Sequence, residues 1–272
     1  MKFYCINDTF VHCHGSCDKV RPKNPWIFNE IPVVEDMDPV LYVDHKIMEA
    51  KDLPESHDFG WLCESPPILD STVNWILDNM DWCENRFIGI FTPDKSLLEV
   101  SDMFIEAPGG SNMPWIKDWK MRPKSKLVSI IASDKRHLEG HRLRHKIVEE
   151  DPTIDVYGRG YSPIDNKEEG LEDYMFSFCI ENAQVDFYYT EKITDAIACG
   201  TIPIYWGSED IFEVFDPRGI IMLEDLTEGV AELSPELYEE MIPFAENNLQ
   251  YLQEIRTADD IVQDLMRDMT NE

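Results

Sequence analysis

The stretch from Tyr174 to Leu223 constrains the fold of this chain more than any other part of its sequence. It begins with Met175–Ile180, an apolar run without a charge, as expected for a strand buried on both faces of a sheet. A polar loop then leads to Thr190, the predicted N-cap of a short helix that ends at Gly200. The apolar strand Thr201–Trp206 follows. Strand, helix and strand in this order predict a parallel, Rossmann-like sheet.

The first turn of that helix carries Glu191 and Lys192. A helix N-terminus at the carboxyl end of parallel strands presents free N–H groups and favours an anion. A lysine there opposes the helix dipole unless an anion lies between them. The pair is therefore typical of a ligand site, in which the carboxylate accepts from sugar hydroxyls and the ammonium contacts phosphate. A solvated helix start that carries Glu and Lys by chance fits the spacing equally well.

Three strings of residues in this region carry a family resemblance. They are Phe-x-x-x-x-Glu-Asn ending at Asn182, Tyr-x-Thr-Glu-Lys ending at Lys192, and Gly-Thr-Ile-Pro-Ile-Tyr-Trp-Gly starting at Gly200. Together they resemble the donor-site signature of the α-1,3/1,4-fucosyltransferases, glycosyltransferase family 10. Several fixed spacings over roughly fifty residues make this pattern far more specific than a lone glycine motif. The resemblance implies an α/β fold of GT-B type, with two Rossmann-like domains facing across a cleft and C-terminal helices bracing both.

The chain is predicted to divide near residue 120. Residues 1–120 alternate short apolar strands with polar connections and are expected to form an N-terminal α/β domain. The resemblance implies that this domain binds the acceptor. A segment rich in turn formers, residues 107–120, is the best linker candidate. Residues 121–272 are expected to form the Rossmann-like domain that binds the nucleotide sugar, GDP-fucose. Two acidic helices, Pro235–Ile255 and Ala258–Met269, end the chain.

Apolar periodicity predicts the remaining elements. The predicted strands are Met1–Ile6, Val40–Val43, Phe59–Cys63, Phe87–Phe91, Met103–Glu106, Leu127–Ala132, Ile154–Tyr157 and Gly219–Leu223, and the predicted helices are Ser71–Met80 and Leu138–Glu150.

Composition limits the class of partner. A net charge of −30 argues against nucleic acid or an anionic membrane surface. Ten of the 24 lysines and arginines nevertheless lie between Lys117 and Lys146, which suits a small polyanion such as a nucleotide diphosphate. No apolar run approaches the ~20 residues of a membrane span, and no signal-peptide pattern opens the sequence, so a cytoplasmic enzyme is expected.

Cofactor and metal signals are weak. No G-x-G-x-x-G is present, so a dinucleotide cofactor is not supported. The segment from His12 to Cys17 holds four potential ligands, but its spacing fits no common zinc pattern. We therefore expect a site without a metal ion. Cys63, Cys179 and Cys199 lie in strand or helix patterns and are expected to be reduced core residues.

Sugar transfer needs a base for the acceptor hydroxyl, and the resemblance implies Glu64, in Trp-Leu-Cys-Glu-Ser-Pro-Pro, as that base. The alternative is a carboxylate that only caps the turn before Pro66. Asp44 and His45 are lesser candidates, because they also follow a predicted strand.

Cations must stabilise the leaving diphosphate. The family has an arginine on the helix after the Ser133-Asp134 turn. Arg142 is the first choice and Arg144 the alternative, because the register is uncertain by two residues. Lys192 is the second cation, and Arg159, in a Gly-Arg-Gly turn, is a weaker candidate.

The resemblance assigns the nucleoside and sugar contacts to the motif strings. It implies that Glu191 accepts from ribose hydroxyls, that Tyr188 contacts the donor, and that Asn182 satisfies polar groups near the sugar. Glu181 is either a ligand or a support that orients Lys192.

The function implied is inverting transfer of fucose from GDP-fucose to a hydroxyl of a glycan acceptor, with no cofactor. Two alternatives stay open. One is the same reaction with a different nucleotide sugar, and the other is a catalytically silent protein that binds nucleotide or glycan.

Overall fold

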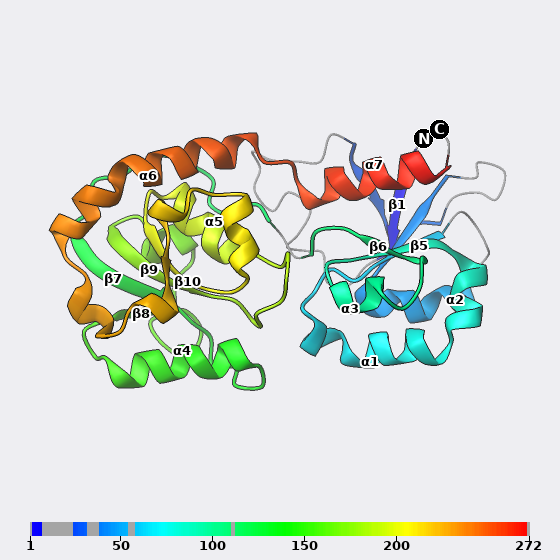
Figure 1. Ribbon diagram of the computed structural model, residues 1–272, viewed down its shortest axis with the longest axis horizontal. Coiled ribbons are helices and arrows are strands. Elements are labelled where there is room, and N and C mark those ends of the chain that lie inside the picture. Colours follow the sequence, from blue (N-terminus) through cyan, green and yellow to red (C-terminus); the bar gives the residue numbers. More distant parts are fainter. Residues whose placement is uncertain (1, 7–23, 32–37, 54–57, 110–111, 271–272) are drawn as a thin grey trace. The chain divides into compact units, whose positions relative to one another are not determined.

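The computed structural model describes residues 2–6, 24–31, 38–53, 58–109 and 112–270. The segment from His12 to Cys17 lies outside these residues. The chain divides into two compact units (Figure 1). Unit 1 comprises Met1–Asn112, Val185–Tyr188 and Arg256–Glu272, and unit 2 comprises Met113–Gln184 and Tyr189–Ile255.

Unit 1 is built on a six-stranded sheet in the order β2-β1-β3-β4-β5-β6, with every neighbouring pair parallel. Its strands are β1 (Phe3–Ile6), β2 (Trp26–Phe28), β3 (Val40–Val43), β4 (Asp58–Trp61), β5 (Phe87–Thr92) and β6 (Phe104–Glu106). Its helices are η2 (Asp44–Asp52), α1 (Pro66–Asp78), α2 (Met80–Arg86), α3 (Lys95–Leu98) and α7 (Ala258–Thr270).

Both faces of this sheet are covered, as a parallel sheet requires. On one face, Val40 and Tyr42 pack with Leu69 and Ile76 of α1. On the other, alternate residues of the same strands pack against α7, which contributes Ala258, Val262 and Met266. Figure 1 shows α7, in red, on the opposite side of the sheet from α1 and α2.

Unit 2 is built on a five-stranded parallel sheet in the order β11-β10-β9-β7-β8. Its strands are β7 (Lys126–Ile131), β8 (Asp155–Tyr157), β9 (Tyr174–Ile180), β10 (Ile202–Trp206) and β11 (Ile221–Met222). Its α-helices are α4 (Glu139–Glu150), α5 (Glu191–Ala198) and α6 (Pro235–Glu254), and its 3₁₀ helices are η3 (Lys167–Gly170), η4 (Glu209–Glu213), η5 (Pro217–Gly219), η6 (Leu223–Asp225) and η7 (Gly229–Glu232).

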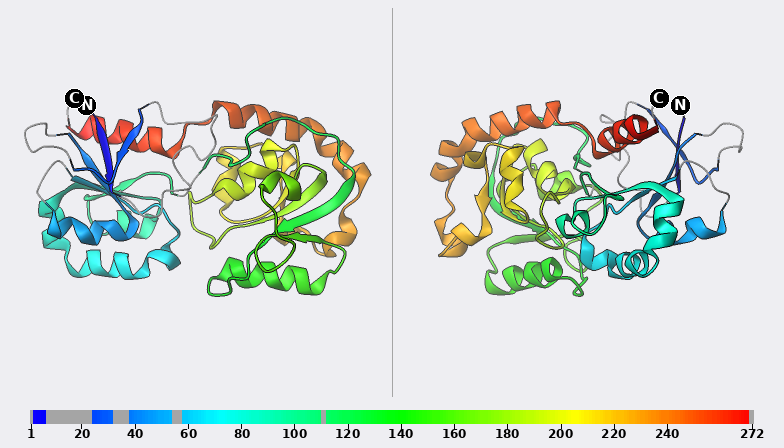
Figure 2. Two further views of the ribbon diagram at one scale, coloured as in Figure 1. Left: turned by 180° about the vertical axis from the view of Figure 1, so that it is seen from behind. Right: turned by 45° about the vertical axis from the view of Figure 1, so that its right-hand side comes forward.

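Helices also cover both faces of the unit 2 sheet. Leu143 and Ile147 of α4 pack on one face, and Ile193 and Ile197 of α5 pack on the other. The first half of α6 joins the core on the α4 face, and its second half joins the core around α5. Figure 2 shows this unit from two further directions, with α4 in green and α6 in orange.

The structural units differ in extent from the predicted domains. Residues 113–120 belong to unit 2, where the N–H groups of Trp115 and Ile116 donate to Asp195 at 2.6 and 3.1 Å. Residues 256–272 belong to unit 1, because the apolar face of α7 is buried on its sheet. The two C-terminal helices thus brace one unit each, α6 on unit 2 and α7 on unit 1.

Most predicted elements are present, with ends shifted by one or two residues. The predicted helix Ser71–Met80 begins earlier, at Pro66, because proline suits the first turn of a helix and Ser65 is extended. Several elements were not predicted, among them the short strand β2, the helices α2 and α3, and the 3₁₀ helix η2. Gly200 has a φ of +67°, which fits its predicted place just after α5.

Candidate functional site

The carboxyl edge of the unit 2 sheet is where the strand order reverses. After β7 the chain adds β8 on one side, and then β9, β10 and β11 on the other. In sheets of this kind, ligands bind outside the carboxyl ends of the strands at such a switch point. β9 ends here at Ile180, and α4 follows the carboxyl end of β7. The switch point therefore brings Glu181 and Asn182 close to the first turn of α4.

Gly140 permits this close approach. A Cβ atom at this position would lie 1.7 Å from the carbonyl oxygen of Glu181 and 3.1 Å from Cα of Asn182. The N–H of Gly140 instead donates to the Asn182 carbonyl at 3.2 Å. The start of α4 is thus held directly against the end of β9.

The two arginines proposed as alternatives lie in different surroundings. Arg144 is buried, and its guanidinium donates to the Ile180 carbonyl and, at 3.3 Å, to Oδ1 of Asn182. Arg142 is exposed, and its Nη1 donates to the carbonyl of His137 at 2.9 Å. The structure therefore brings Arg144, and not Arg142, together with the motif residue Asn182.

His141, which directly precedes Arg142, was not predicted. The N–H of Leu138 donates to its Nδ1 at 3.3 Å. Burial, together with the positive charges of neighbours that include Arg144 and Lys192, lowers the pKa of His141 to about 4. A neutral imidazole that accepts through Nδ1 carries its proton on Nε2. The site thus holds a neutral histidine in a field of positive charge.

Thr190 and Glu181 organise the start of α5. The Thr190 hydroxyl accepts from the N–H of Lys192, which confirms the predicted N-cap. Glu181 has no exposed surface, and Oε1 accepts from the Thr190 N–H at 2.8 Å. Its Oε2 lies 3.1 Å from Nζ of Lys192, which also bonds to the Thr190 hydroxyl at 2.9 Å. The carboxylate of Glu181 therefore supports Lys192 from the end of β9.

Glu191 is paired with a lysine from another part of the chain. Nζ of Lys167, on η3, lies 3.1 Å from Oε1 of Glu191 and 2.7 Å from Oδ2 of Asp195. Burial alone would raise the pKa of Glu191, but the charges of Lys167 and Lys192 outweigh it and lower this pKa to about 2. Burial raises the pKa of Asp195 to about 6 against the charge of Lys167. Glu191 is therefore an ionised acceptor at neutral pH.

Two further predicted residues have other surroundings. Tyr188 belongs to unit 1 through the segment Val185–Tyr188, and only 1% of it is exposed. Its ring packs near Gly109, where a Cβ atom would lie 3.2 Å from Cδ2 of Tyr188. Arg159 is exposed in the turn after β8. The cluster in unit 2 therefore consists of Arg144, Glu181, Asn182, Glu191 and Lys192.

The predicted base lies at the carboxyl edge of the unit 1 sheet. Glu64 follows β4, and Oδ1 of Asp44 accepts from the N–H groups of Cys63 and Glu64 at 2.7 and 3.2 Å. Asp44 is buried and has a φ of +53°, a conformation that Asp tolerates better than most residues. Its carboxylate therefore holds the Glu64 segment.

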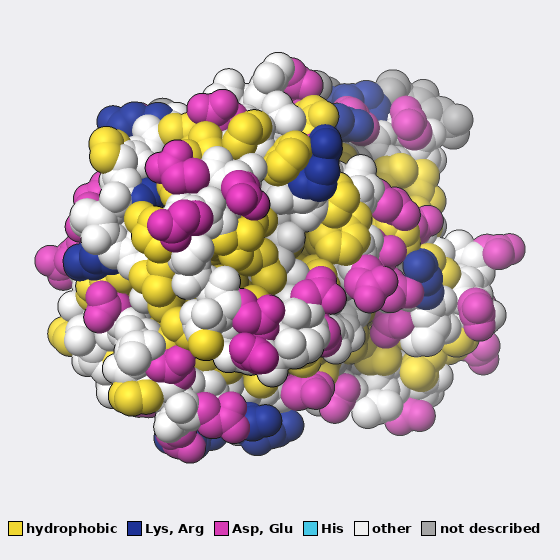
Figure 3. Space-filling view, turned by 60° about the vertical axis from the view of Figure 1, so that its left-hand side comes forward, with side chains coloured by type: hydrophobic (Ala, Val, Ile, Leu, Met, Phe, Trp, Pro, Cys, Tyr) yellow, Lys and Arg dark blue, Asp and Glu magenta, His cyan; other side chains and the backbone are white. Residues whose placement is uncertain are grey.

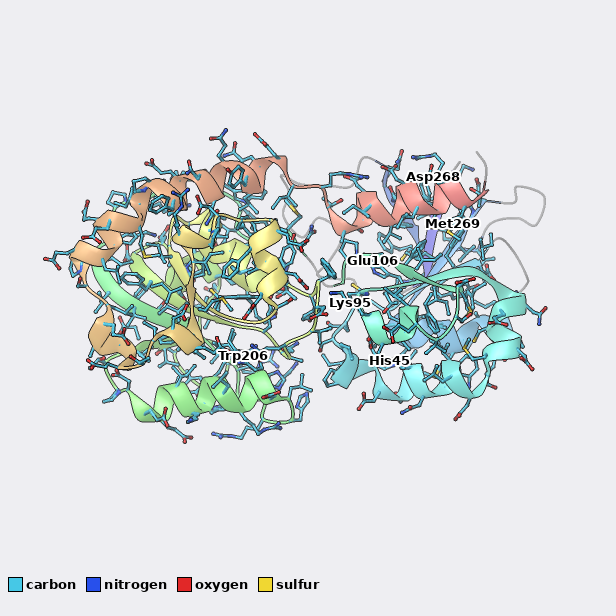
Figure 4. All side chains as sticks on the ribbon, viewed as in Figure 1. His45, Lys95, Glu106, Trp206, Asp268 and Met269 are labelled. Carbon is cyan, nitrogen blue, oxygen red and sulfur yellow. The ribbon has the colours of Figure 1, made fainter. Side chains whose placement is uncertain are left out.

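His45, the other lesser candidate, is exposed on η2, with Nδ1 2.5 Å from the hydroxyl of Thr72. Figure 4 labels it with Lys95 and Glu106, which also come from unit 1.

The group of basic residues between Lys117 and Lys146 is divided by the fold. Nζ of Lys124 donates to the carbonyls of Glu172 and Cys199 at 3.0 and 2.8 Å, and burial lowers its pKa to about 8. Arg122 pairs with Glu172 at 3.3 Å. Lys124 therefore bonds to the C-terminal end of α5, opposite the helix start that carries Lys192.

Charge at the surface is mostly negative. Figure 3 shows acidic side chains spread over the visible face, with lysines and arginines in a few small groups. Among the described residues, no three His, Cys, Asp or Glu side chains are grouped as a metal site would require. Within the same residues, no helix is both long and apolar enough to cross a membrane.

The same half of the chain matches a protein family. Residues 121–253 match the C-terminal region of glycosyltransferase family 10 (fucosyltransferase). The α-(1,3)-fucosyltransferase FucT of Helicobacter pylori is 46% identical over 66 residues, which are 24% of this chain and 14% of that protein. An α-(1,4)-fucosyltransferase of Arabidopsis thaliana is 35% identical over 51 residues, 19% of this chain and 13% of the relative. These alignments thus span only a small part of each relative.

Solved structures show the same fold. A crystal structure of an α1,3-fucosyltransferase has a TM-score of 0.54 at 16% identity and covers 100% of this chain and 90% of its own. Another, with GDP-fucose, has a TM-score of 0.53 at 19% identity, over 93% and 88%. The crystal structure of TarM has a TM-score of 0.57 at 11% identity, over 86% and 55%. The predicted GT-B fold class is thereby confirmed.

Proposed function

We propose that this chain transfers fucose from GDP-fucose to a hydroxyl of a glycan acceptor, with inversion at the anomeric carbon, because residues 121–253 match the C-terminal region of glycosyltransferase family 10. The main support is the cluster at the start of α5. There a buried carboxylate holds Lys192 at 3.1 Å, beside an ionised Glu191. A fixed cation next to a fixed acceptor suits a molecule with phosphate and hydroxyl groups side by side, as a nucleotide sugar has.

We assign the diphosphate to Lys192 and Arg144. Both contribute to the field that lowers the pKa of His141, so both charges lie near the start of α4. Nε2–H of His141 is a further donor for a phosphate oxygen. Arg142, the first choice from sequence, is exposed, and in this proposal it only attracts the donor at long range. Because these cations offset the charge of the leaving group, the proposed reaction needs no metal ion.

In the proposed reaction, Glu64 removes the proton of the acceptor hydroxyl. The oxygen then attacks C1 of fucose from the face opposite the phosphate, and the bond from C1 to the β-phosphate oxygen breaks with its electrons leaving on GDP. A β-linked donor thus becomes an α-fucoside, and the products are the fucoside, GDP and protonated Glu64. Glu191 holds the ribose, and Asn182 contacts the donor near the sugar.

The test is transfer from a panel of nucleotide sugars to a mixed glycan acceptor pool, with products weighed by mass spectrometry and the anomer read by NMR. We expect fucose to be transferred and the product to be α. Glu64→Gln should lose at least about 100-fold in turnover while GDP affinity stays within about twofold, since a general base contributes roughly 10²–10⁴-fold. Chelation of divalent ions should leave the rate unchanged.

Each alternative has its own outcome in this experiment. Transfer of another sugar would keep the reaction class and replace fucose as the donor. Binding of GDP without turnover on any donor would favour a silent binding protein. If Glu64→Gln kept full activity, Glu64 would not be the base.

A further inference from the structure

Lys167 lies outside the three motif strings but within the site. It is 24 residues from Glu191 and 28 from Asp195 in sequence, and its ammonium contacts both carboxylates, at 3.1 and 2.7 Å. The same Nζ lies 4.0 Å from the centroid of the Trp115 ring. Its side chain is 22% exposed. Lys167 is therefore held from three sides rather than extended into solvent.

Backbone N–H groups fix the position of Lys167 indirectly, through Asp195. Oδ1 of Asp195 accepts the N–H groups of Trp115 and Ile116 at 2.6 and 3.1 Å, which leaves Oδ2 for the lysine. Asp195 is 1% exposed, so it cannot turn away to water. A chain of contacts therefore runs from two backbone N–H groups through Asp195 and Lys167 to the carboxylate of Glu191.

Charges alternate along this cluster. Nζ of Lys192 lies 3.1 Å from Glu181 and 3.8 Å from Glu191, and Lys167 continues the series to Asp195. In the proposed function Lys192 turns to the diphosphate, so its pairing with Glu191 weakens when the donor binds. Lys167 then remains as the ammonium group that is paired with Glu191. Without it, a carboxylate that is only 12% exposed would lose its closest counter-charge.

We propose that Lys167 is a positioning residue that keeps Glu191 as an oriented carboxylate acceptor for the ribose hydroxyls of the donor nucleotide. This inference rests on the proposed function. It adds that recognition of the ribose depends on Lys167, which acts through Glu191 and touches neither phosphate nor sugar.

The experiment compares the binding of GDP and 2′,3′-dideoxy-GDP by titration calorimetry. The second nucleotide keeps the base and both phosphates but has no hydroxyl for Glu191. The variants are Lys167→Met, which keeps an apolar stem over Trp115, and Lys167→Arg, which keeps the charge. The control is Lys120→Met, because Lys120 is an exposed lysine of unit 2 that pairs with Asp118 at the surface. It loses the same charge from the same unit.

The wild-type protein should bind GDP about tenfold or more tightly than the dideoxy nucleotide, as expected for hydrogen bonds to a charged acceptor. Lys167→Met should reduce this ratio to about threefold or less by weakening GDP alone. Lys167→Arg and Lys120→Met should keep the wild-type ratio.

An unchanged ratio in Lys167→Met, or equal weakening of both nucleotides, would overturn the inference and leave the proposed function standing. If the wild-type protein bound neither nucleotide, both this inference and the proposed function would be contradicted. If the wild-type protein bound both nucleotides equally, Glu191 would not contact the ribose hydroxyls, and the proposed role of Lys167 would be contradicted as well.

Discussion

Nζ of Lys192 lies 3.1 Å from Oε2 of Glu181, a carboxylate with no exposed surface. The other oxygen of Glu181 accepts the N–H of Thr190, so one buried side chain joins the end of β9 to the start of α5. Glu181 was expected to be either a ligand or a support for Lys192. Its contacts favour the support, because the carboxylate is already bonded to protein donors.

We expect Glu181→Gln to lower the free energy of unfolding by about 1–3 kcal/mol, since the amide keeps the shape but loses a buried, charged hydrogen bond. Urea unfolding followed by circular dichroism measures this difference. Glu209→Gln is the control, because Glu209 is exposed. Coincident unfolding curves for wild type and Glu181→Gln would contradict the support role.

Arg144→Lys and Arg142→Lys separate the two arginines while keeping their charge. A lysine cannot reproduce the guanidinium bonds of Arg144 to the Ile180 carbonyl and Asn182, so we expect a loss of about tenfold or more in GDP affinity. Exposed Arg142 should tolerate the change within about twofold. Titration calorimetry decides between them, and the reverse order would restore Arg142 as the diphosphate ligand.

Asp44 is expected to set the position of Glu64. Asp44→Ala removes the acceptor for the N–H groups of Cys63 and Glu64, and we expect kcat to fall about tenfold from misplacement of the base. Asp44→Asn keeps an acceptor oxygen and tolerates the φ of +53°, so kcat should stay within about threefold. GDP affinity should not change in either variant. Equal losses in both variants would show that the charge of Asp44, and not its hydrogen bonds, matters.

A pH-dependent contribution to stability is expected from Asp259 of α7. Burial raises the pKa of Asp259 to about 7, while a hydrogen bond from Nε1 of Trp26, at 2.7 Å, opposes this and the neighbouring Asp260 adds to it. The folded protein keeps a proton that the unfolded chain releases near its usual pKa of about 4. The stabilisation is therefore complete below about pH 4 and is lost as the pH rises to about 7, by at most about 4 kcal/mol.

Asp259→Asn should remove this part of the pH dependence when unfolding free energies are measured from pH 4 to 8. Asp268→Asn is a matched control on the same helix, because Asp268 is exposed (Figure 4). If wild type and Asp259→Asn lost stability equally between pH 4 and 7, Asp259 would not be the group that titrates.

The sheet of unit 2 is predictable because its strands are buried on both faces and read as apolar runs. Strand β2 is not, since Trp26–Phe28 is only three residues long and lies at a sheet edge. The sheet that α7 packs against also cannot be predicted from the sequence. Its apolar stripe predicts a buried helix face, but nothing in that stripe indicates which of the two sheets it covers.

The candidate site is predictable only where its residues are neighbours in sequence. Thr190, Glu191 and Lys192 form one helix start, so their spacing predicts a shared site. Arg142 and Arg144 are two residues apart and point about 200° apart around a helix, so the choice needs the face that meets β9. That face is set by the contact of Gly140 with Glu181, which involves the fold and not the local pattern.

The path of the chain has a consequence for dissecting the protein into fragments. It passes between the units after residues 112, 184, 188 and 255. A piece that ends at residue 255 would leave the face of the first sheet that α7 covers open to water, with Trp26 deprived of its partner Asp259. A piece spanning residues 113–255 would carry Val185–Tyr188 away from the core they occupy. No single cut yields two intact halves, so gene truncation is a poor way to assign roles here, and point substitutions are the appropriate tool.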